Sequence, residues 1–378
     1  MRILQLTSDW KWTGPAAPML ELALALRARG HEVELACPEA PAGASPSLCS
    51  RARSAGLAPQ LLLERARGIA PVRDARDAAR LRTLLAKTDV GVVHCWHTRD
   101  HGLALRAAAS RRRAGRTRVV RSYKSADPIA AWPWNRWLFG PASDGLMCVS
   151  PRAAERNRRL RGGRPTLGAF GAVDLERFRP APPDKAVRES LGLSPENRVV
   201  GIVARAQRHR RFDLLLEAAA RAMARDASLR LLIVGRGTHI DETARAPAGR
   251  LGIADRVIFA GYRDTDYADV LRCADLFTFL VPGSDGGCRA VLEAAACGLP
   301  AVVSSRGALP EIVIDGETGR VVPEAPAALA DAWLALLHDS ALRGRLAAAA
   351  RRRAQQHFAP EELARQVEAL YQEASPLR

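Results

Sequence analysis

An α/β fold with two domains is the architecture that the sequence predicts, and three observations support it. Short apolar runs typical of buried strands alternate with helix-like stretches along the chain. This alternation starts again after a proline-rich stretch at residues 180–183. The 378 residues, 48% of them hydrophobic, are enough for two domains that each bury a core. Because such strands form parallel sheets, ligands are expected at the carboxyl ends of the strands.

Residues 1–180 are predicted to form the first Rossmann-like domain. A strand, a loop through Gly14, a helix at residues 17–29 and a second strand give its opening order. The first strand lacks a following G-x-G-x-x-G run, so the dinucleotide-binding fingerprint is absent. The strands predicted in this half span residues 2–8, 31–37, 90–95, 119–123 and 145–150.

Residues 181–356 repeat this order and are predicted to form a second Rossmann-like domain. Residues 357–378 contain one further helix, predicted at residues 360–371. The strands predicted in the second domain span residues 199–204, 229–234, 256–260, 276–281 and 301–304. The helices predicted between and after them span residues 212–223, 289–297, 325–337 and 341–356.

The charge of the chain is uneven. The net charge is +17, and residues 1–180 contribute 31 Lys and Arg against 15 Asp and Glu, a net +16. A field of that sign favours an anionic partner such as a lipid surface, an anionic glycan or nucleic acid. Two clusters of basic residues stand out, and each is either a solvated helix surface or a polyanion contact. They comprise Arg111, Arg112, Arg113, Arg116, Arg118 and Arg121, and Arg156, Arg158, Arg159, Arg161 and Arg164.

The sequence also bounds the environment of the protein. No apolar run reaches the roughly 18 residues that span a bilayer, and the chain opens with a strand-like RILQLT rather than a signal peptide. Its 7 cysteines, an odd number without a C-x-x-C pair, favour reduced thiols. A cytoplasmic protein is therefore expected.

The stretch at residues 280–322 carries the clearest chemistry. A buried strand is followed by a glycine-rich loop, and then by a helix whose N-terminal N–H groups favour an anion. Asp285 in the loop and Glu293 in the helix flank that helix end and can accept hydrogen bonds from hydroxyl groups. Hydroxyls on both sides of an anion are the pattern of a sugar nucleotide. Arg205 and Arg210 follow a strand of the same domain and are expected at the same sheet edge.

These residues resemble the signature of the retaining GT-B glycosyltransferases of family 4. That family has two Glu separated by seven residues before an Ala-Cys-Gly-Leu-Pro turn, which here is residues 296–300. Glu293 matches the second Glu, Asp285 stands at the first, and Gly286-Gly287-Cys288 replaces the usual Gly-Phe-Gly-like run. The segments at residues 171–180 and 310–319 are also similar to the family's pattern, so the resemblance covers nearly the whole chain.

The resemblance implies two Rossmann-like domains facing a cleft, with the C-terminal helix crossing back to the N-terminal domain. It implies transfer of a sugar from a UDP or GDP sugar to an acceptor hydroxyl, with no metal or other cofactor. The residues implied as catalytic are Arg205, Arg210 and Asp285. Those implied as donor-binding are Gly14, Gly235, Gly261, Gly286, Gly287, Cys288, Arg289 and Glu293. The acceptor-side candidates are Trp10, Trp12, His97, His101, Tyr123 and Lys124.

The basic first half and an aromatic cluster point to the acceptor. Trp132, Trp134 and Trp137 are either packed in the interior, placed at lipid headgroups, or used to stack sugars. We expect a lipid-linked or cell-envelope glycan as acceptor, and a peripheral contact with an anionic membrane. The alternatives are transfer to a small soluble natural product, a non-catalytic sugar-nucleotide-binding protein, or a sugar-nucleotide epimerase. A nucleic-acid partner is not expected, because no helix-turn-helix, RNA-recognition or zinc-finger signature is present.

Overall fold

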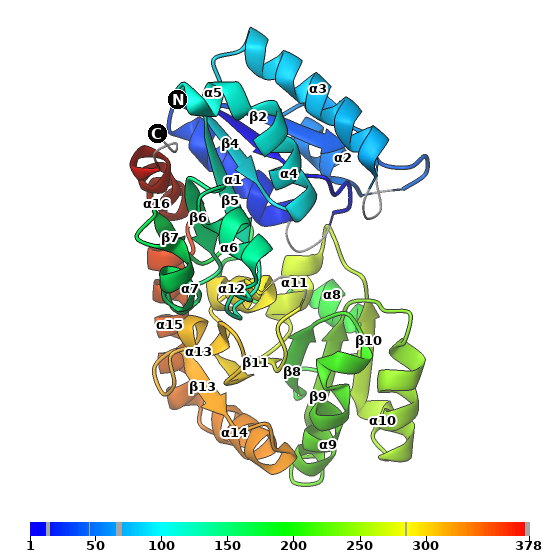
Figure 1. Cartoon of the computed structure of the whole chain (residues 1–378). Coiled ribbons are helices and arrows are strands. Elements are labelled where there is room, and N and C mark those ends of the chain that lie inside the picture. The colour runs from blue at the N-terminus through cyan, green and yellow to red at the C-terminus, as the bar shows by residue number, and fades with distance from the viewer. Residues whose placement is uncertain (13–15, 45, 66–69, 284–285, 375–378) are drawn as a thin grey trace. The chain divides into compact units, whose positions relative to one another are not determined.

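The structure, a computed structural model, divides into two compact units. It describes residues 1–12, 16–44, 46–65, 70–283 and 286–374. Unit 1 comprises Met1–Ala172 and Pro360–Arg378, and unit 2 comprises Val173–Ala359 (Figure 1). The change from unit 1 to unit 2 thus lies before the proline-rich stretch at residues 180–183. The final helix belongs to unit 1.

Unit 1 is built on a parallel sheet with seven strands among the described residues, in the order β3-β2-β1-β4-β5-β6-β7. The strands are β1 (Arg2–Leu6), β2 (Glu32–Pro38), β3 (Leu61–Leu63), β4 (Val92–Cys95), β5 (Arg118–Tyr123), β6 (Gly145–Cys148) and β7 (Thr166–Gly168). The helices are α1 (Ala16–Ala28), α2 (Leu48–Ser54), α3 (Pro71–Lys87), α4 (Thr98–Ala107), α5 (Ala109–Arg113), α6 (Pro133–Phe139), α7 (Pro151–Arg161) and α16 (Pro360–Glu373).

Unit 2 repeats this plan with six parallel strands among the described residues, in the order β10-β9-β8-β11-β12-β13. The strands are β8 (Arg198–Val203), β9 (Leu229–Val234), β10 (Val257–Gly261), β11 (Leu276–Phe279), β12 (Ala301–Ser304) and β13 (Gly319–Val322). The helices are α8 (Lys185–Ser190), α9 (Phe212–Met223), α10 (Ala246–Arg250), α11 (Tyr267–Arg272), α12 (Arg289–Ala296), α13 (Leu309–Ile312), α14 (Pro326–His338) and α15 (Ser340–His357).

Each sheet reverses its strand order beside its first strand. In unit 1, β2 and β3 extend the sheet on one side of β1, and β4 begins the other side. In unit 2, β9 and β10 lie on one side of β8 and β11 lies on the other. Ligands of parallel α/β sheets bind at the carboxyl ends of the strands at such a reversal. The relevant segments are therefore those that follow β1 and β4 in unit 1, and β8 and β11 in unit 2.

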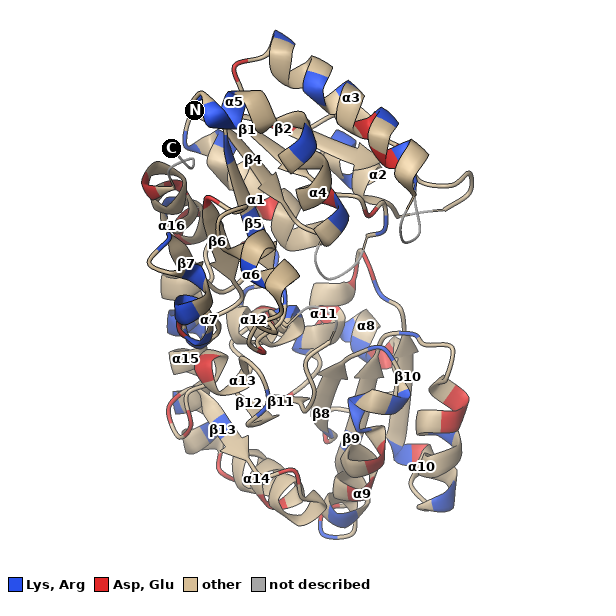
Figure 2. Ribbon diagram, in the orientation of Figure 1, with Lys and Arg blue, Asp and Glu red and all other residues tan. Residues whose placement is uncertain are grey.

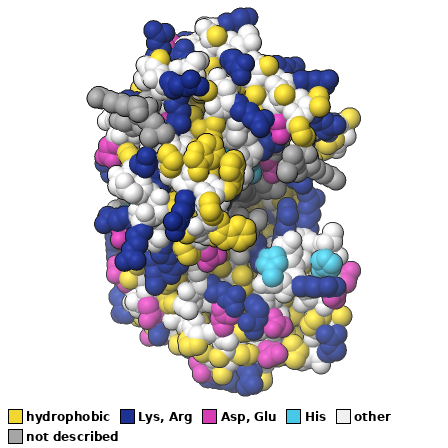
Figure 3. Space-filling model, viewed as in Figure 1, with side chains coloured by type: hydrophobic (Ala, Val, Ile, Leu, Met, Phe, Trp, Pro, Cys, Tyr) yellow, Lys and Arg dark blue, Asp and Glu magenta, His cyan; other side chains and the backbone are white. Residues whose placement is uncertain are grey.

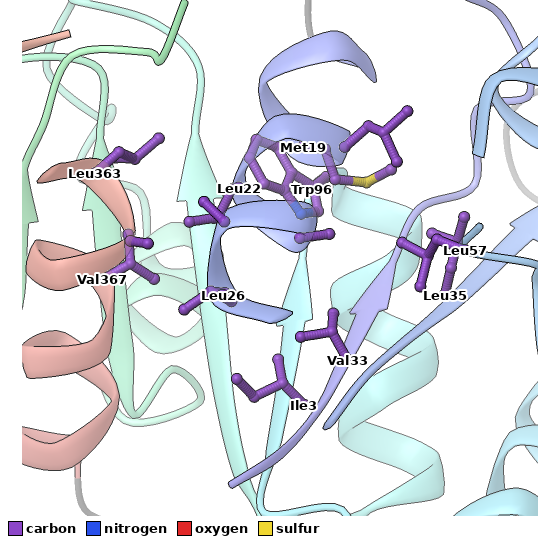
Figure 4. Close-up of a cluster of buried hydrophobic side chains, with 14 of the residues drawn as sticks. Ile3, Met19, Leu22, Leu26, Val33, Leu35, Leu57, Trp96, Leu363 and Val367 are labelled. Atoms are coloured by element: carbon purple, nitrogen blue, oxygen red, sulfur yellow. The ribbon is translucent and has the colours of Figure 1, made fainter. Parts of the chain in front are cut away.

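Alternating side chains give the sheet of unit 1 two apolar faces. Ile3 packs with residues of α1 and α2 in one buried cluster, whereas Leu4 packs with residues of α3 and α4 in another. Figure 4 shows the first cluster, in which Leu363 and Val367 of α16 approach Leu22 and Leu26 of α1. The C-terminal helix therefore completes one face of the core of unit 1.

Buried hydrogen bonds also fasten α16 to this sheet. The Tyr371 hydroxyl lies 2.7 Å from Nδ1 of His94, and Nε2 of His94 lies 2.8 Å from Oγ of Ser122. The Gln5 side chain lies 3.4 Å from the same hydroxyl and accepts a bond from the Trp96 indole at 2.7 Å. Burial lowers the pKa of His94 to about 3, so its imidazole is neutral in the folded unit. Because an unpaired buried polar group is costly, this network specifies where α16 docks.

The two basic clusters predicted as surfaces are in part structural. In the first, Arg111 bonds Asp89 and Thr117, and Arg112 makes a two-pronged bond with Asp144. Arg121 is buried. In the second, the buried Arg161 donates to the backbone carbonyls of Phe139, Gly140, Ser143 and Pro165. Arg111, Arg112 and Arg161 thus hold helices and loops together instead of forming an open charged surface, and Arg121 joins two strands through the carbonyl of Cys95. Other arginines of α7 are exposed, and Figure 2 colours the Lys and Arg positions of this helix blue.

Two further findings bear on the environment. All 7 cysteines are free and buried. Among the described residues, no helix is both long enough and apolar enough to cross a membrane.

Candidate active site

The segment after β8 is fixed by close backbone contact with the segment after β9. A Cβ atom on Gly235 would lie 2.3 Å from the carbonyl oxygen of Ala204, and one on Gly237 would lie 2.2 Å from that of Ala206. Gly235 also has a φ of 134°. Glycine is therefore required at both positions, because any side chain would displace the backbone on either side of Arg205. The Arg205 side chain itself is exposed at this sheet edge.

Arg210 connects the segment after β8 with the segment after β11. Its Nη1 donates to the carbonyl of Val281 at 2.7 Å, and its guanidinium lies 5.9 Å from the centre of the Phe279 ring. It also lies so close to Gly283 that a Cβ there would meet the guanidinium. The next residue, Arg211, adopts a left-handed conformation and begins α9, with its side chain bonded to Glu324. The sheet reversal of unit 2 thus brings Arg210 against the loop after β11, and Arg205 lies in the same segment after β8.

That loop leads directly into α12. Cys288 is buried and adopts a left-handed conformation with φ 50° before the helix starts at Arg289. Its thiol contacts the carbonyl of Gly286 at 3.4 Å. The side chain of Cys288 does not cap the N-terminus of α12. The first N–H groups of a helix have no partner within the helix. Asp285, predicted as catalytic, lies outside the described residues.

Glu293 is buried on the second turn of α12 and both of its oxygens are engaged. Oε1 accepts a bond from Nε of Arg289 at 2.6 Å, and Oε2 accepts one from the Tyr267 hydroxyl at 2.7 Å. Burial and the neighbouring carboxylate raise the pKa of Tyr267 well above its usual value, so this hydroxyl keeps its proton and donates. A carboxylate has about four acceptor positions, so Glu293 is oriented by these partners and can still accept from a ligand hydroxyl.

The remaining glycine predicted on the donor side ends β10. Gly261 has a φ of 70°, which favours glycine, and its carbonyl accepts a bond from the N–H of Gly235 at 2.8 Å. Beside it, the Arg236 guanidinium lies 4.8 Å from the centre of the Tyr262 ring. Gly261 thus holds Gly235 in position, and Gly235 packs against the backbone beside Arg205.

Unit 1 presents a hydrogen-bonded cluster at its own sheet reversal. His97, directly after β4, has Nδ1 at 3.1 Å from Oγ1 of Thr7, which follows β1. Its Nε2 lies 2.7 Å from Nζ of Lys124, which follows β5. An ammonium group can only donate, so Nε2 accepts and the proton of a neutral ring is on Nδ1. Two acceptor-side candidates, His97 and Lys124, are therefore in direct contact.

Asp100 holds this cluster in place. It is fully buried, and Oδ2 accepts bonds from the N–H of His97 at 2.6 Å and of Trp96 at 3.1 Å, and lies 3.3 Å from Nδ1 of His97. Burial acts to raise the pKa of Asp100, but hydrogen bonds from His97 and Ser8 lower it below its usual value. The charged carboxylate therefore fixes the orientation of His97. Its position three residues after His97, as the third residue of α4, is a helix-capping pattern that is readable in the sequence.

One acceptor-side candidate lies in the interior of unit 1. His101 is fully buried, with its Nε2 3.4 Å from the carbonyl of Ala142, and burial lowers its pKa to about 3. It sits one turn further along α4 than His97, where the helix faces the interior. Tyr123, at the end of β5, is partly buried and packs edge-on against Phe139 with ring centres 5.7 Å apart.

The other first-half candidates lie in or beside the segment after β1. Trp10 and Trp12 are partly buried, and Trp12 packs against the core of unit 1. Guanidinium or ammonium groups lie over both rings, Lys11 over Trp10 and Arg51 over Trp12. Gly14, predicted on the donor side, lies outside the described residues.

The arrangement in unit 2 suits an anion with hydroxyl groups attached. Cationic side chains and helix N–H groups meet at one sheet edge, and a preoriented carboxylate lies on the helix behind them. Among the described residues, no group of three or more His, Cys, Asp or Glu is placed to hold a metal ion. Tyr267 and Asp100 are the supporting residues that the sequence did not reveal as such, and Tyr267 carries no motif that would have identified it.

Solved structures identify the class of fold. The crystal structure of a glycosyltransferase from Rickettsia africae matches with a TM-score of 0.82 and 16% identity, over 99% of this chain and 98% of the other. That of HepE from Anabaena, in complex with UDP and glucose, matches with a TM-score of 0.79 and 18% identity, over 98% of each chain. The chain therefore has the GT-B fold, as the sequence predicted.

Sequence comparisons identify the family. Residues 13–167 match the family described as Glycosyltransferase Family 4, and residues 197–339 match the one described as Glycosyl transferases group 1. Together these regions cover most of the chain, so the protein belongs to the family 4 glycosyltransferases. The family resemblance found in the sequence is thus confirmed.

Two relatives illustrate the range of that family. D-inositol 3-phosphate glycosyltransferase of Rhodococcus opacus is 40% identical over 192 residues, which are 48% of this chain and 42% of that protein. The chain thus spans less than half the length of this relative. The GDP-mannose-dependent alpha-(1-6)-phosphatidylinositol monomannoside mannosyltransferase of Mycolicibacterium smegmatis is 31% identical over 260 residues, 65% of this chain and 66% of that protein.

Proposed function

We propose that this protein transfers a sugar from a nucleotide diphosphate sugar to an acceptor hydroxyl with retention of the anomeric configuration. The observation that carries the proposal is the placement of Arg205 and Arg210 at the sheet reversal of unit 2, beside the loop that leads into α12. Family membership and the UDP-bound state of HepE support a nucleotide sugar as the donor.

In the proposed reaction, the bond between the anomeric carbon and the diphosphate oxygen breaks as the acceptor oxygen bonds to the same face of that carbon. Negative charge then grows on the leaving diphosphate. Arg205, Arg210 and the N–H groups of α12 stabilise that charge, and this stabilisation is greatest in the transition state. A diphosphate oxygen takes the proton of the acceptor hydroxyl. Under this scheme the reaction needs no metal ion.

Glu293 and Asp285 take the hydroxyl groups of the donor in this proposal. Glu293 would accept from the ribose, because Arg289 and Tyr267 already hold its carboxylate in one orientation. A fixed acceptor loses less conformational entropy when the ligand binds than a mobile one does. Asp285 would position the sugar, and UDP or GDP sugars are the proposed donors.

The acceptor proposed is a lipid-linked or cell-envelope glycan, reached from the cytoplasmic side by a peripheral protein. The phosphatidylinositol mannoside acceptor named for the Mycolicibacterium smegmatis relative supports this choice. His97 and Lys124 are proposed to bind acceptor hydroxyls. They follow neighbouring strands and contact each other, and Asp100 holds His97 in place.

Two measurements test the proposal. Thermal-shift screening with UDP, GDP, ADP and their sugars is expected to show a higher melting temperature with a UDP or GDP compound, because a ligand of the folded state stabilises it by mass action. The anomeric configuration of the product is then determined by NMR. Stabilisation by none of the nucleotides would refute the donor site, and an inverted product would refute retention. Donor binding with neither transfer nor slow donor hydrolysis would indicate a non-catalytic binder.

A further inference from the structure

Helix α6 of unit 1 and the residue before it, Trp132, expose three tryptophans within six residues. The exposed fractions are 73% for Trp132, 63% for Trp134 and 46% for Trp137. The rings of Trp134 and Trp137 also contact each other, with centres 5.0 Å apart. Figure 3 shows hydrophobic side chains gathered in the region where Figure 1 places α6. Large exposed aromatic patches are uncommon on proteins and usually mark an interaction surface.

This exposure is built into a rigid part of the fold. The inner side of α6 buries Leu138 and Phe139 in a cluster with residues of β6 and α7. The buried Arg161 of α7 donates to the carbonyls at the end of α6, and Asn157 of α7 accepts a bond from the N–H of Ile129 at 2.8 Å. The helix therefore cannot turn its tryptophans inward without breaking these contacts.

The neighbouring helix α7 adds positive charge to the same region. It contains a single carboxylate, Glu155, which pairs with Arg158 at 3.2 Å. The exposed arginines of α7 are Arg152, Arg156, Arg158 and Arg159. On α3, by contrast, exposed Arg73, Arg76 and Arg80 each lie within 4.0 Å of Glu64 or Asp77. Along α7 the exposed arginines therefore outnumber the carboxylates, whereas three of the four exposed arginines of α3 are each beside an acidic side chain.

We propose that Trp132, Trp134 and Trp137 of α6 and the exposed arginines of α7 form a membrane-docking surface for an anionic bilayer. Tryptophan is favoured at the level of lipid headgroups, and arginines beside it attract anionic lipids. A second copy of this chain is a poor occupant, because a symmetric contact would bring the same excess of arginines together. A neutral glycan would use the tryptophans but gain nothing from the arginines.

This surface gives a physical basis to the lipid-linked acceptor proposed above. The loop from Lys124 to α6 is tied to α7, since Arg156 donates to the carbonyl of Ala126 at 3.2 Å. Docking α6 on a bilayer would therefore hold the edge of the sheet that carries His97 and Lys124 near the lipid surface. Although its purpose rests on the proposed function, the docking itself needs neither donor nor acceptor, so the two are tested separately.

The test measures binding of the full chain to vesicles without nucleotide. Vesicles of phosphatidylcholine with phosphatidylglycerol are expected to bind the protein in flotation, and pure phosphatidylcholine vesicles much less. Replacing Trp132, Trp134 and Trp137 together by serine is expected to weaken binding at least about tenfold, since apolar surface is lost. It should also abolish the quenching of tryptophan fluorescence by brominated lipids. Replacing Arg152, Arg156 and Arg159 by glutamine should weaken binding by roughly 100-fold.

Matched variants on α3 serve as controls. Val72 is 65% exposed, so Val72→Ser removes an exposed apolar side chain elsewhere on unit 1. Glutamine at Arg73, Arg76 and Arg80 removes as many exposed arginines as the α7 variant. The proposal is overturned if the tryptophan variant binds like the wild type, or if the α3 variants lose as much binding as the α6 and α7 variants. An unchanged melting temperature and unchanged thermal shift with nucleotide show that each variant is folded.

Discussion

Unit 1 and unit 2 reverse their strand order at the same place, between the first and fourth strands of each sheet, but end those strands with different chemistry. Unit 2 places Arg205 and Arg210 there, supported by glycine contacts and backbone carbonyls. Unit 1 places Thr7, His97 and Lys124 there, linked by hydrogen bonds and held by a buried carboxylate. The topology therefore decides where a ligand binds, and the residues that follow the strands decide which ligand.

The two units also differ in the role of the buried carboxylate near the strand ends, Glu293 in unit 2 and Asp100 in unit 1. Glu293 orients itself through Arg289 and Tyr267 and keeps acceptor capacity. Asp100 accepts hydrogen bonds from the backbone N–H and the ring of His97, so it positions another residue. One carboxylate is suited to contact a ligand, and the other acts through its neighbour. Variants that act on one unit, or on one carboxylate, test whether the two units have separate roles.

The largest effect is expected from the core of each unit. Tyr371 and Trp333 are both fully buried, the first in unit 1 and the second in unit 2. Each change to alanine should cost roughly 3–5 kcal/mol of unfolding free energy through a cavity. Tyr371→Ala should lower the stability of unit 1 and Trp333→Ala that of unit 2. Hydrogen exchange measured residue by residue locates the loss, and an equal loss in both units from either variant would contradict this division.

Arg210→Ala tests the cationic edge of unit 2. Loss of a preorganised charge at the leaving group should lower kcat by roughly 100- to 1000-fold, with the melting temperature little changed. Arg208→Ala is the matched control, because Arg208 is exposed and pairs with Glu242. Steady-state kinetics should show the control within about twofold of the wild type, since exposed ion pairs contribute little. Equal losses in both variants would mean that positive charge in general, and not Arg210, is what matters.

Glu293→Gln and Asp100→Asn separate the two carboxylates. Glu293→Gln should weaken donor binding about tenfold, since a charged hydrogen-bond acceptor for a ligand hydroxyl is lost. Asp100→Asn should leave the donor Kd unchanged and alter the response to the acceptor. Titration calorimetry with the nucleotide sugar measures the first effect. Weaker donor binding by the Asp100 variant would show that the roles of the two units are not separate.

The smallest effect is expected from pH, as a change in the free energy of unfolding for each pH unit. In the folded protein, burial lowers the pKa of His94 and of His101 to about 3. The unfolded chain titrates near pH 6.5, so between pH 6.5 and 3 the unfolded state binds more protons. Each imidazole should then remove about 1.4 kcal/mol of stability for every pH unit of acidification below 6.5. Denaturant unfolding across this range measures the slope, which His94→Gln should reduce. A slope that is flat below pH 6.5 would contradict the neutral, buried state.

The sequence predicted the fold class and the family because each rests on local patterns. Apolar runs such as residues 229–234 identified strands, and the glycine-rich loop before Glu293 identified the family. The sequence did not predict the short strands β3, β7 and β13. Three or four residues carry too little periodicity, and the pairing of these strands depends on neighbours distant in the sequence. The final helix was expected on the first domain from the resemblance alone, and the buried contacts of Tyr371 give the physical reason.

At the site, residue types were easier to predict than residue environments. Arg210 was named from its place after a strand, but its bond to the Val281 carbonyl depends on which strand is the neighbour of β8. His97 and His101 looked equivalent in the sequence, yet one is partly exposed and the other buried. His97 precedes α4 as its N-cap residue with extended backbone, whereas His101 lies within the helix and packs against Phe139. The sequence likewise suggested that Arg161 belongs to a basic surface, whereas in the structure it is buried and donates to backbone carbonyls.

The place of α16 also has a consequence for how the protein is made. Unit 2 is one continuous stretch, Val173–Ala359, so all of its residues have been synthesised before α16 is translated. Unit 1 begins the chain but lacks one wall of its core, and the partner for His94, until Tyr371 emerges. Domains usually fold in the order of synthesis. Here unit 1 is started before unit 2 and finished after it, so the nascent chain carries an open apolar face throughout the synthesis of unit 2.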